Sequence, residues 1–389
     1  MSAAETVIIG AGVTGASTAF HLTRRTRGRV VVVERNTAGS GPTSRTIGIV
    51  RLHYSYEPLI QLAVRGLEFF ERFEAHTGAT ADFIRTGFLL LARPDQLPGV
   101  EANVSLQQRL GVRTALLTPA DVARLDPRME VEDVGGAAYE PDAGYADGYA
   151  AVAGFIGAAR RRGAELWEGT AAERILTSGG RVTGVATSRG VIETGQVLVA
   201  AGPWTPSLLA TVDARLPIEA SRQQVVQLSP PSGFGGLGVV IEDMTQGFYA
   251  RPESAASVLA GVLEEEAEEI VSPAGFNQGV DFDFVRRVGA LWAHRYPRAA
   301  DAEVRGGYAS LYDITPDWQP VLGAVPGADG VFVAAGFSGH GFKLAPALGD
   351  CLAALLRGEA PAVDLMPFAP TRFASGRLIR GRHAQGILG

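Results

Sequence analysis

The pattern of apolar and polar positions at the start of the chain predicts a strand, a turn, a helix and a second strand. A short β-branched run over Thr6–Ile9 leads directly into residues 10–15, whose sequence is GAGVTG. Apolar residues continue at helical spacing through Leu22, and a second apolar run over Val30–Val33 ends on Glu34. Because β-branched runs favour strands and a 3.6-residue apolar period favours a helix, this order indicates a β-α-β unit.

The three glycines of this turn are spaced as the pyrophosphate of a dinucleotide requires. Gly10 permits the tight turn, Gly12 has no side chain to block the pyrophosphate, and Gly15 lets the helix pack closely on the sheet. The helix N-terminus, at Val13 and Thr14, offers free N–H groups and a positive dipole to the phosphates. A glycine-rich turn alone is a weak signal, but here the strand, the helix and the second strand agree with it.

An acidic residue stands where the ribose of such a dinucleotide would lie. Glu34 comes nineteen residues after the last of these glycines, and a carboxylate there can accept hydrogen bonds from both ribose hydroxyls. Arg35 follows, and the polar segment 36–46 contains Thr43 and Ser44. This segment can wrap a cofactor with hydroxyl and backbone donors, although it is also typical of a plain surface loop. We therefore expect an ADP-containing dinucleotide to bind near the start of the chain.

The remaining apolar runs predict a second domain and a return to the first sheet. Helical spacing over 58–73 predicts a helix, and the apolar run 83–92 predicts a buried strand that begins the second domain. Alternation over 222–261 predicts antiparallel strands, and the acids within 264–269 fit a solvated loop or helix face. The run 197–204 (VLVAAGPW) would return the chain to the dinucleotide sheet, where glycine permits close cofactor approach. The cofactor candidates of this part are Ala172, Ala201, Gly202 and Trp204.

A second strand–glycine–helix unit lies far along the chain from the first. The apolar strand Val331–Ala335 runs into the turn 336–343, GFSGHGFK, and a helix is expected over 344–356. The N-terminus of that helix could point at the redox-active end of the cofactor and stabilise negative charge there. The turn supplies further candidates, namely Gly336, Gly339, His340, Gly341, Phe342 and Lys343.

Composition draws attention to one residue of this turn and excludes several classes of protein. Arginine supplies 34 of the 35 basic residues, so the one lysine, Lys343, is expected to have a functional role rather than to be an ordinary surface cation. The 389 residues suffice for two domains, and the net charge of −6 argues against a nucleic-acid partner.

The cysteine and histidine content and the absence of long apolar runs narrow the class further. Six histidines without HxH or HExxH spacing indicate no metal site, and the single cysteine, Cys351, excludes an internal disulfide framework. No leader and no membrane-spanning run is visible in the sequence, so we expect a soluble cytoplasmic protein without a membrane partner.

Together these motifs resemble the FAD-dependent D-amino-acid oxidase superfamily, and within it the sarcosine oxidase, dimethylglycine dehydrogenase and glycine oxidase branch. The similarity covers nearly the whole chain, and GFSGHGFK is its most specific part. The other matching segments are residues 10–15 with Glu34 and Arg35, 49–51, 85–89 and 199–204.

The resemblance implies an α/β fold (α+β in its two-domain form) with a Rossmann-like FAD-binding domain and a second, antiparallel-sheet substrate domain above the flavin. The FAD-binding domain would be discontinuous. The expected boundaries are 1–80, 145–215 and 318–389 for the FAD-binding domain, and 81–144 and 216–317 for the substrate domain.

The resemblance also implies catalytic roles. In monomeric sarcosine oxidases an arginine and a lysine grip the substrate carboxylate, and the matching positions are Arg51 and Lys343. Two cations in a low-dielectric pocket would fix an anionic amino acid and orient its Cα–H toward flavin N5. The tyrosine near the flavin matches Tyr312, and His340 would lie by the flavin pyrimidine. Further pocket candidates, which could equally be structural, are Tyr249 and His53.

Three positions depart from the pattern of monomeric sarcosine oxidases. Ser310 stands where they tether their flavin through a cysteine, which implies non-covalent FAD. Their oxygen-activating lysine falls on the strand 258–261, where this chain has no lysine. Gly48 replaces an arginine beside the flavin. A dehydrogenase that passes electrons to an acceptor other than O2 is therefore an alternative to an oxidase.

The resulting hypothesis is a flavoenzyme that oxidises the C–N bond of a small amino acid, of the secondary or N-methyl kind. Hydride would pass to flavin N5 and give an imine. A D-amino-acid or glycine oxidase or dehydrogenase is the alternative on the same fold. Two rivals differ in kind: a flavin-binding subunit that needs a partner chain, and an NAD-dependent dehydrogenase. The expected partners are an amino acid or amine and O2 or another electron acceptor.

Overall fold

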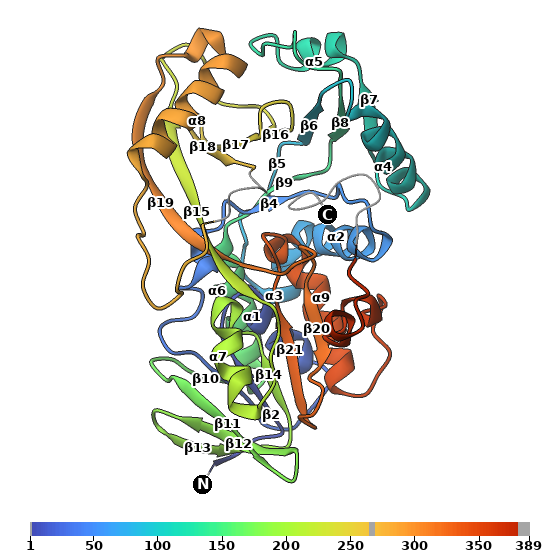
Figure 1. The fold of residues 1–389 in the computed structure, drawn as a ribbon, viewed down its shortest axis with the longest axis vertical. Helices are drawn as coiled ribbons and strands as arrows, with labels where there is room; N and C mark the ends of the chain where they lie inside the picture. The colour runs from blue at the N-terminus through green and yellow to red at the C-terminus, as the bar shows by residue number, and fades with distance from the viewer. Residues whose placement is uncertain (1, 264–268, 380–389) are drawn as a thin grey trace.

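The computed structural model describes residues 2–263 and 269–379, and Figure 1 shows two large sheets, one above the other. The long strands β15 (Glu219–Ser229) and β19 (Glu303–Ile314) reach from the upper sheet toward the lower one. Most of the acidic run predicted over 264–269 lies outside the described residues. Its last member, Glu269, is exposed and accepts a hydrogen bond of 2.8 Å from Arg222.

The lower sheet carries both of the predicted strand–glycine–helix units. Its strand order is β10-β3-β2-β14-β21-β20, and neighbouring strands are parallel except β21 and β20. Strand β14 pairs with both β2 and β21, which confirms that the segment 197–204 returns to this sheet. The strands are β2 (Thr6–Ile9), β3 (Val30–Val33), β10 (Glu165–Trp167), β14 (Val197–Val199), β20 (Val321–Ala324) and β21 (Val331–Ala335).

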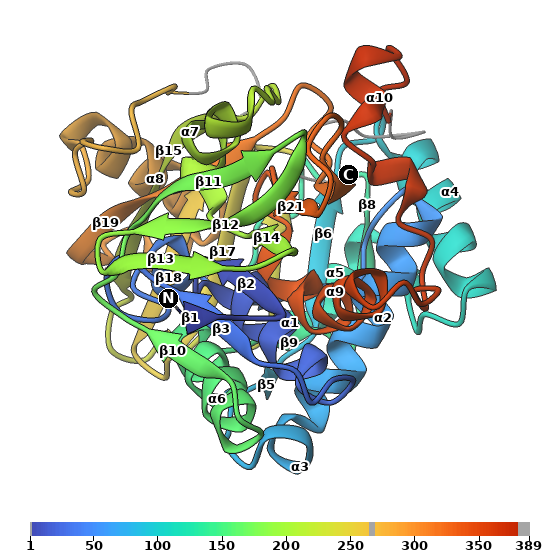
Figure 2. The same cartoon turned by 90° about the horizontal axis from the view of Figure 1, so that it is seen from below.

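Helices pack on this sheet in contact with one another. Helix α1 (Val13–Leu22) contacts α6 (Gly148–Arg161) and α9 (Gly341–Leu356), and α9 contacts α2 (Glu57–Glu71), as Figure 2 shows. The helix predicted over 58–73 ends at Glu71, and a separate short helix, α3 (Phe73–Thr77), follows. Helix α9 begins at Gly341 rather than at residue 344, so Lys343 lies in its first turn.

The upper sheet has eight strands in the order β19-β15-β18-β17-β16-β6-β8-β7. All neighbours are antiparallel except β16 and β6. The antiparallel strands predicted over 222–261 are present in it. Of the buried strand predicted over 83–92, only Phe88–Ala92 belongs to this sheet, whereas Ile84–Arg85 is an exposed strand of a smaller sheet. Its other strands are β6 (Phe88–Ala92), β7 (Ala115–Leu117), β8 (Gly136–Glu140), β16 (Val240–Asp243), β17 (Phe248–Ser254) and β18 (Ser257–Val262).

The two faces of the upper sheet meet different surroundings. Phe248, Ala250 and Ala260 belong to an apolar cluster with Trp292 of α8 (Phe282–Arg295). Tyr249, which lies between the first two of these, lines a pocket on the opposite face. Side chains alternate between the faces of a strand, so the register of the strands decides which of them reach that pocket.

Two smaller sheets and several short helices complete the described fold. The sheets have the orders β4-β9-β5 and β1-β13-β12-β11. Within the described ranges, no helix combines the length and apolar character needed to cross a membrane. The remaining elements are β1 (Ser2–Ala3), β4 (Ile49–Val50), β5 (Ile84–Arg85), β9 (Gly144–Tyr145), β11 (Ala172–Ser178), β12 (Arg181–Thr187), β13 (Gly190–Glu193), α4 (Leu97–Arg109), α5 (Pro119–Leu125), α7 (Thr205–Leu209) and α10 (Thr371–Ala374), with 3-10 turns at Pro42–Arg45, Gly202–Trp204, Ala210–Val212, Pro297–Ala299 and Met366–Phe368.

Candidate functional site

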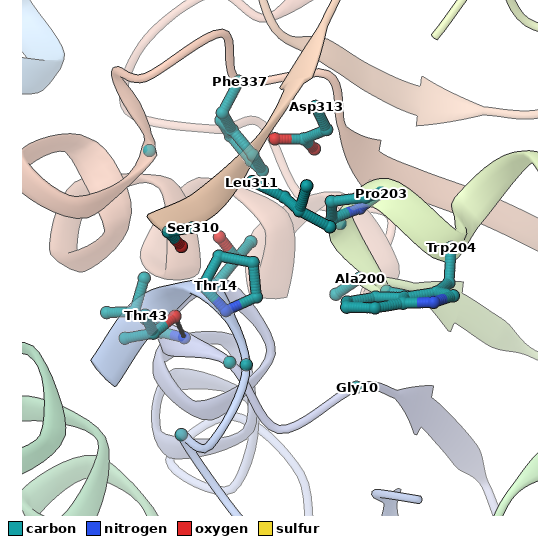
Figure 3. Close-up of a pocket in the computed structure, with 18 of the residues that line it drawn as sticks. Gly10, Thr14, Thr43, Ala200, Pro203, Trp204, Ser310, Leu311, Asp313 and Phe337 are labelled. Carbon is teal, nitrogen blue, oxygen red and sulfur yellow. Dashed lines mark hydrogen bonds between the residues drawn. The ribbon is translucent and has the colours of Figure 1, made fainter. Parts of the chain in front are cut away.

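A pocket of about 410 Å³ brings together residues from both large sheets. Figure 3 shows its walls, from Gly10 and Trp204 at one side to Phe337 and Asp313 at another. Most of the predicted site residues line it: Gly10, Gly12, Val13, Thr14, Glu34, Arg35, Thr43, Ala172, Ala201, Gly202, Trp204, Tyr249, Tyr312, Gly339, Gly341 and Phe342. The predicted residues that are not part of its lining are Gly15, Ser44, Arg51, Gly336, His340 and Lys343.

The glycines of the first turn meet different constraints. Gly10 has a φ of +105°, and a Cβ there would lie 2.3 Å from the carbonyl oxygen of Ala200. A Cβ on Gly15 would lie 2.0 Å from the carbonyl oxygen of Gly10, so helix and turn can touch only without that atom. A Cβ on Gly12 would meet only the Thr43 hydroxyl, at 3.3 Å. The first two glycines are therefore required by the fold, whereas Gly12 keeps the backbone open toward the pocket.

Helix α1 presents its N-terminus to the pocket without a side-chain cap from its own N-cap residue, Gly12. The Val13 N–H donates to Thr43 Oγ1 at 3.2 Å, which ties the predicted wrapping segment to the helix start. Ser44 belongs to the same 3-10 turn, but it is not part of the pocket lining, and its hydroxyl donates to the Gly41 carbonyl at 3.1 Å. The N–H groups of the first turn and the helix dipole at this point suit a phosphate.

The acid predicted to hold the ribose is fixed by the backbone around it. Glu34 accepts hydrogen bonds from the N–H groups of Ala11 at 3.0 Å and Asn36 at 2.9 Å, one on each carboxylate oxygen. Each oxygen of an ionised carboxylate has a second lone pair, so both can still accept from hydroxyls in the pocket. Next to it, the Arg35 guanidinium lies 3.7 Å from the centre of the Trp204 ring.

A buried aspartate that the sequence did not point to holds the second glycine turn. Asp313, near the end of β19, accepts a hydrogen bond of 2.6 Å from the N–H of Gly336, which has a φ of +67°. Its backbone carbonyl accepts from the N–H of Ser338 at 2.9 Å. Burial raises the pKa of Asp313 to about 6, although hydrogen bonds from backbone N–H groups act against this. These contacts fix the turn from which α9 starts, so that Gly339 and Gly341 reach the pocket wall.

Four ionisable side chains form what we call the charge cluster: Arg51, Glu140, Glu242 and Lys343. All four are buried, and Arg51 Nε lies 3.1 Å from Glu242 Oε2. Burial lowers the pKa of Lys343 well below its ordinary value, and the charge of Arg51 adds to this while Glu242 opposes it. Burial raises the pKa of Glu242, whereas Arg51 and Lys343 lower it. The two predicted cations are therefore close enough to influence each other and share one carboxylate.

The segment that carries Arg51 is fixed by polar contacts on several sides. Glu140 accepts a hydrogen bond of 2.8 Å from the Leu52 N–H, and burial raises the pKa of Glu140 to about 7. Arg51 donates to the His53 carbonyl and lies 4.7 Å from the Tyr54 ring centre. The Tyr54 hydroxyl in turn lies 3.3 Å from Nδ1 of His340, whose ring is buried at the start of α9.

His53 is packed as a neutral residue rather than as a pocket residue. Its imidazole is buried beside Asn103, with 3.4 Å between the side-chain nitrogens. Burial, together with the charge of Arg51, lowers its pKa to about 3. Of the two roles considered for His53, its surroundings therefore favour the structural one over a role in the pocket.

Strand register connects the charge cluster to the pocket. Glu242 on β16 lies directly opposite Tyr249 on β17, and Tyr249 lies opposite Gly261 on β18. Directly opposed residues of an antiparallel pair point to the same face. Tyr249 lines the pocket, so Glu242 belongs to the face of the sheet that covers the pocket. The segment 258–261, where no lysine occurs, belongs to β18, which pairs with β17 on the side away from β16.

Sequence analysis missed three acids of the site: Glu140, Glu242 and Asp313. The available signal was an acid at a buried position of an apolar strand, as in 239–243 (VVIED). That pattern marks a side chain that needs a partner, but it does not identify the partner. The partners come from distant strands, and only the register of the sheet places them together.

Comparison with known proteins assigns the chain to a family. The model of the FAD dependent oxidoreductase family matches residues 5–355. The chain belongs to this family. The fold and the FAD cofactor implied by the sequence resemblance are thereby confirmed, and the NAD-dependent alternative is set aside.

Two relatives and one solved structure show which members of the family the chain is similar to. It is 30% identical to 4-methylaminobutanoate oxidase (formaldehyde-forming) of Paenarthrobacter nicotinovorans over 95% of this chain, but spans only 46% of that relative. It is 26% identical to sarcosine oxidase subunit beta of Rhodobacter capsulatus, over 98% of this chain and 92% of that one. The crystal structure of L-proline dehydrogenase from P. horikoshii superimposes with a TM-score of 0.89 at 27% identity, covering 97% of this chain and 100% of that one.

The residues present fit the FAD that the family requires. The open backbone at Gly12 and the N-terminus of α1 suit the pyrophosphate, and Glu34 retains acceptor capacity for ribose hydroxyls. Farther along the pocket, Tyr312, Gly341 and Phe342 form the wall near the start of the second glycine-turn helix. One pocket thus reaches from a nucleotide-binding turn to the neighbourhood of the charge cluster.

Proposed function

We propose that this flavoenzyme oxidises the C–N bond of a small amino acid, with a secondary or N-methyl amine as the preferred group. The observation that carries the proposal is the charge cluster beside the pocket, in which two buried basic side chains, Arg51 and Lys343, both interact with the Glu242 carboxyl group. Bound FAD supplies the acceptor for the hydride that leaves the substrate carbon. The boundaries given above for the FAD-binding and substrate domains, and a cytoplasmic location, are part of the same proposal.

The roles of the chain's own residues follow from their surroundings. Arg51 and Lys343 would bind the substrate carboxylate, because both carry hydrogen-bond donors that suit an anionic group. Tyr249 and Tyr312 line the pocket and would confine the substrate between the upper sheet and the flavin. His340, buried at the start of α9 and next to Tyr54, would support the flavin from the helix N-terminus.

Non-covalent binding of FAD is part of the proposal. Ser310 lines the pocket at the position where the resemblance would require a cysteine. The single cysteine of the sequence, Cys351, is buried within α9 in the apolar core and does not belong to the pocket lining. A thioether to the flavin therefore has no donor at the pocket.

An anaerobic titration of the purified yellow protein, followed in the visible spectrum, tests the proposal. Sarcosine, N-methyl amino acids, L-proline and D-amino acids would be added in turn. We expect one of the secondary amino acids to bleach the flavin, and the rate of recolouring in air then separates an oxidase from a dehydrogenase. A flavin that stays oxidised with every amino acid, alone and with a partner chain, would contradict the proposal.

A second candidate is a flavin-binding subunit that acts only with another chain. The chain covers 92% of sarcosine oxidase subunit beta at 26% identity, and that relative is by its name one subunit of a larger enzyme. Size-exclusion chromatography with an activity assay on each fraction distinguishes the two. Activity that travels with the single chain supports an independent enzyme, whereas activity found only in a larger complex supports a subunit.

A further inference from the structure

We propose that Glu242 receives the ammonium group of a zwitterionic amino-acid substrate and accepts its proton, so that it selects amino acids over simple carboxylates. This inference rests on the proposed function and adds a residue with a specific role to it. A clamp made only of Arg51 and Lys343 would bind any small carboxylate. With the Glu242 carboxylate beside them, the site complements a ligand that carries both a negative and a positive charge.

The geometry places opposite charges next to each other. Glu242 Oε2 lies 3.1 Å from Arg51 Nε, and both side chains are buried. In a small α-amino acid the ammonium and carboxylate groups are attached to the same carbon. A site for such a molecule needs a cationic and an anionic group side by side, as these two are. The substrate carboxylate would take up part of the cationic charge, and the ammonium would face Glu242.

The register of the upper sheet places Glu242 on the face that covers the pocket, next to the lining rather than within it. Tyr249, directly opposite Glu242, lines the pocket, and its hydroxyl leans over Gly261 on the other neighbouring strand. A Cβ on Gly261 would lie 2.3 Å from that hydroxyl oxygen, so the ring occupies the space that a side chain there would fill. The Tyr249 ring therefore leans toward β18 and away from β16, on which Glu242 stands.

The proton transfer is balanced within the site. An N–H bond of the substrate ammonium breaks, its electron pair stays on nitrogen, and the proton forms an O–H bond with the Glu242 carboxylate. The resulting neutral amine can supply its lone pair as hydride leaves the adjacent carbon, and the proton step itself needs no oxidant. Burial raises the pKa of Glu242, which favours the protonated product.

Glu242→Gln, which keeps the shape and removes the charge, tests the inference with two matched ligand pairs. L-proline and cyclopentanecarboxylate differ in the ring nitrogen, as do sarcosine and butyrate in the chain nitrogen. Binding to the FAD-loaded protein is measured from perturbation or reduction of the flavin spectrum. For E242Q we expect the Kd of the amino acid to rise about 10- to 100-fold, while the Kd of the carboxylate stays constant or falls.

Glu140→Gln is the matched control. It also removes a buried negative charge near Arg51, but Glu140 holds the backbone of Leu52. We expect E140Q to change both members of a ligand pair by the same factor. The inference would be overturned if E242Q changed the Kd of both ligands of a pair by the same factor. It would also be overturned if E140Q lost the preference for the amino acid over the carboxylate as E242Q does.

Two further outcomes keep the test decisive. If E242Q does not retain FAD, Glu242→Asp replaces it. The shortened carboxylate should weaken amino-acid binding and leave carboxylate binding unchanged, and equal effects overturn the inference. Suppose that the natural protein oxidises an amino acid and that E242Q prefers amino acids over carboxylates by the same ratio as the natural protein. The inference then fails, and the proposed function stands. If the natural protein oxidises no amino acid, the proposed function fails, and the binding ratio still decides whether Glu242 meets the ammonium group.

Discussion

The two ends of the pocket are built from different parts of the chain. At the nucleotide end, residues 10–15, the start of α1 and Glu34 come from one β-α-β unit, and backbone groups provide most of the contacts. Beside the other end, next to Phe342 of the lining, the charge cluster collects side chains from the segment after β4, from β8, from β16 and from α9. The first end is a property of local sequence, and the second is a property of the sheet register.

This difference predicts separable failures. A change in the glycine turn should abolish cofactor binding, because the turn has no alternative backbone path. A change in the charge cluster should leave the cofactor in place and affect substrate binding.

Gly15→Ala should have the largest effect on ligand binding. Its added Cβ would lie 2.0 Å from the Gly10 carbonyl oxygen, which forces helix and turn apart. We expect FAD affinity to fall at least about 100-fold, equivalent to about 3 kcal/mol. Gly41→Ala is the control, because Gly41 lines the same pocket with a φ of −78° and an added Cβ would meet nothing within 4 Å. Equal FAD content in the two purified variants would contradict the prediction.

Lys343→Met should affect the opposite end of the pocket. It removes one buried cation of the clamp and keeps a side chain of similar length, so we expect substrate Kd to rise about 30- to 100-fold, or about 2–3 kcal/mol. FAD content should stay close to that of the natural protein. The measurement is a substrate titration with FAD content as its internal control. An unchanged substrate Kd in this variant and in Arg51→Ala would rule out the carboxylate clamp.

Unlike Lys343→Met, Arg51→Ala is expected to lower the stability of the fold as well as substrate binding. Its removal leaves the buried Glu242 without its cation at 3.1 Å, which should cost stability by roughly 3–5 kcal/mol. Thermal unfolding of both variants checks this, with the larger drop expected for Arg51→Ala.

The same contrast explains what could be predicted from sequence. Thr6–Ile9, the glycine turn and Glu34 lie within one short stretch, where apolar periodicity and glycine spacing carry the information. Arg51 and Lys343 could be named from the family resemblance, but their partner could not. Glu242 and Tyr249 meet across a ladder, and a shift of one residue in either strand would send one of them to the other face. Nothing in the local sequence of β16 defines that pairing.

Asp313→Asn should have an intermediate effect that depends on pH. Because burial raises the Asp313 pKa from 3.8 to about 6, the folded protein holds this proton more tightly than the unfolded chain. The resulting stabilisation is present below about pH 4 and is lost as the pH rises through about 6. We expect the natural protein to lose roughly 1–3 kcal/mol more than D313N between pH 4 and pH 7. Denaturant unfolding at both pH values measures it, and parallel pH profiles for the two proteins would contradict the assignment.

Trp204→Leu should have the smallest effect. It removes the ring that supports Arg35 at 3.7 Å while keeping an apolar pocket wall. A cation–π contact at a partly exposed site contributes about 0.5–1 kcal/mol, so the FAD Kd should rise about 2- to 5-fold. Quenching of FAD fluorescence on binding gives the Kd. A loss comparable to that of Gly15→Ala would show that side chains, and not the backbone turn, dominate the nucleotide end.

A crystal structure of the FAD complex with cyclopentanecarboxylate, a ligand that the enzyme cannot oxidise as an amine, tests the central claim most directly. The account predicts the pyrophosphate against residues 10–15, and the ligand carboxylate within hydrogen-bond distance of Arg51 or Lys343. A carboxylate bound away from both cations, with Arg51 still held by Glu242, would contradict the division of the pocket into a backbone-built cofactor end and a charge-built substrate end.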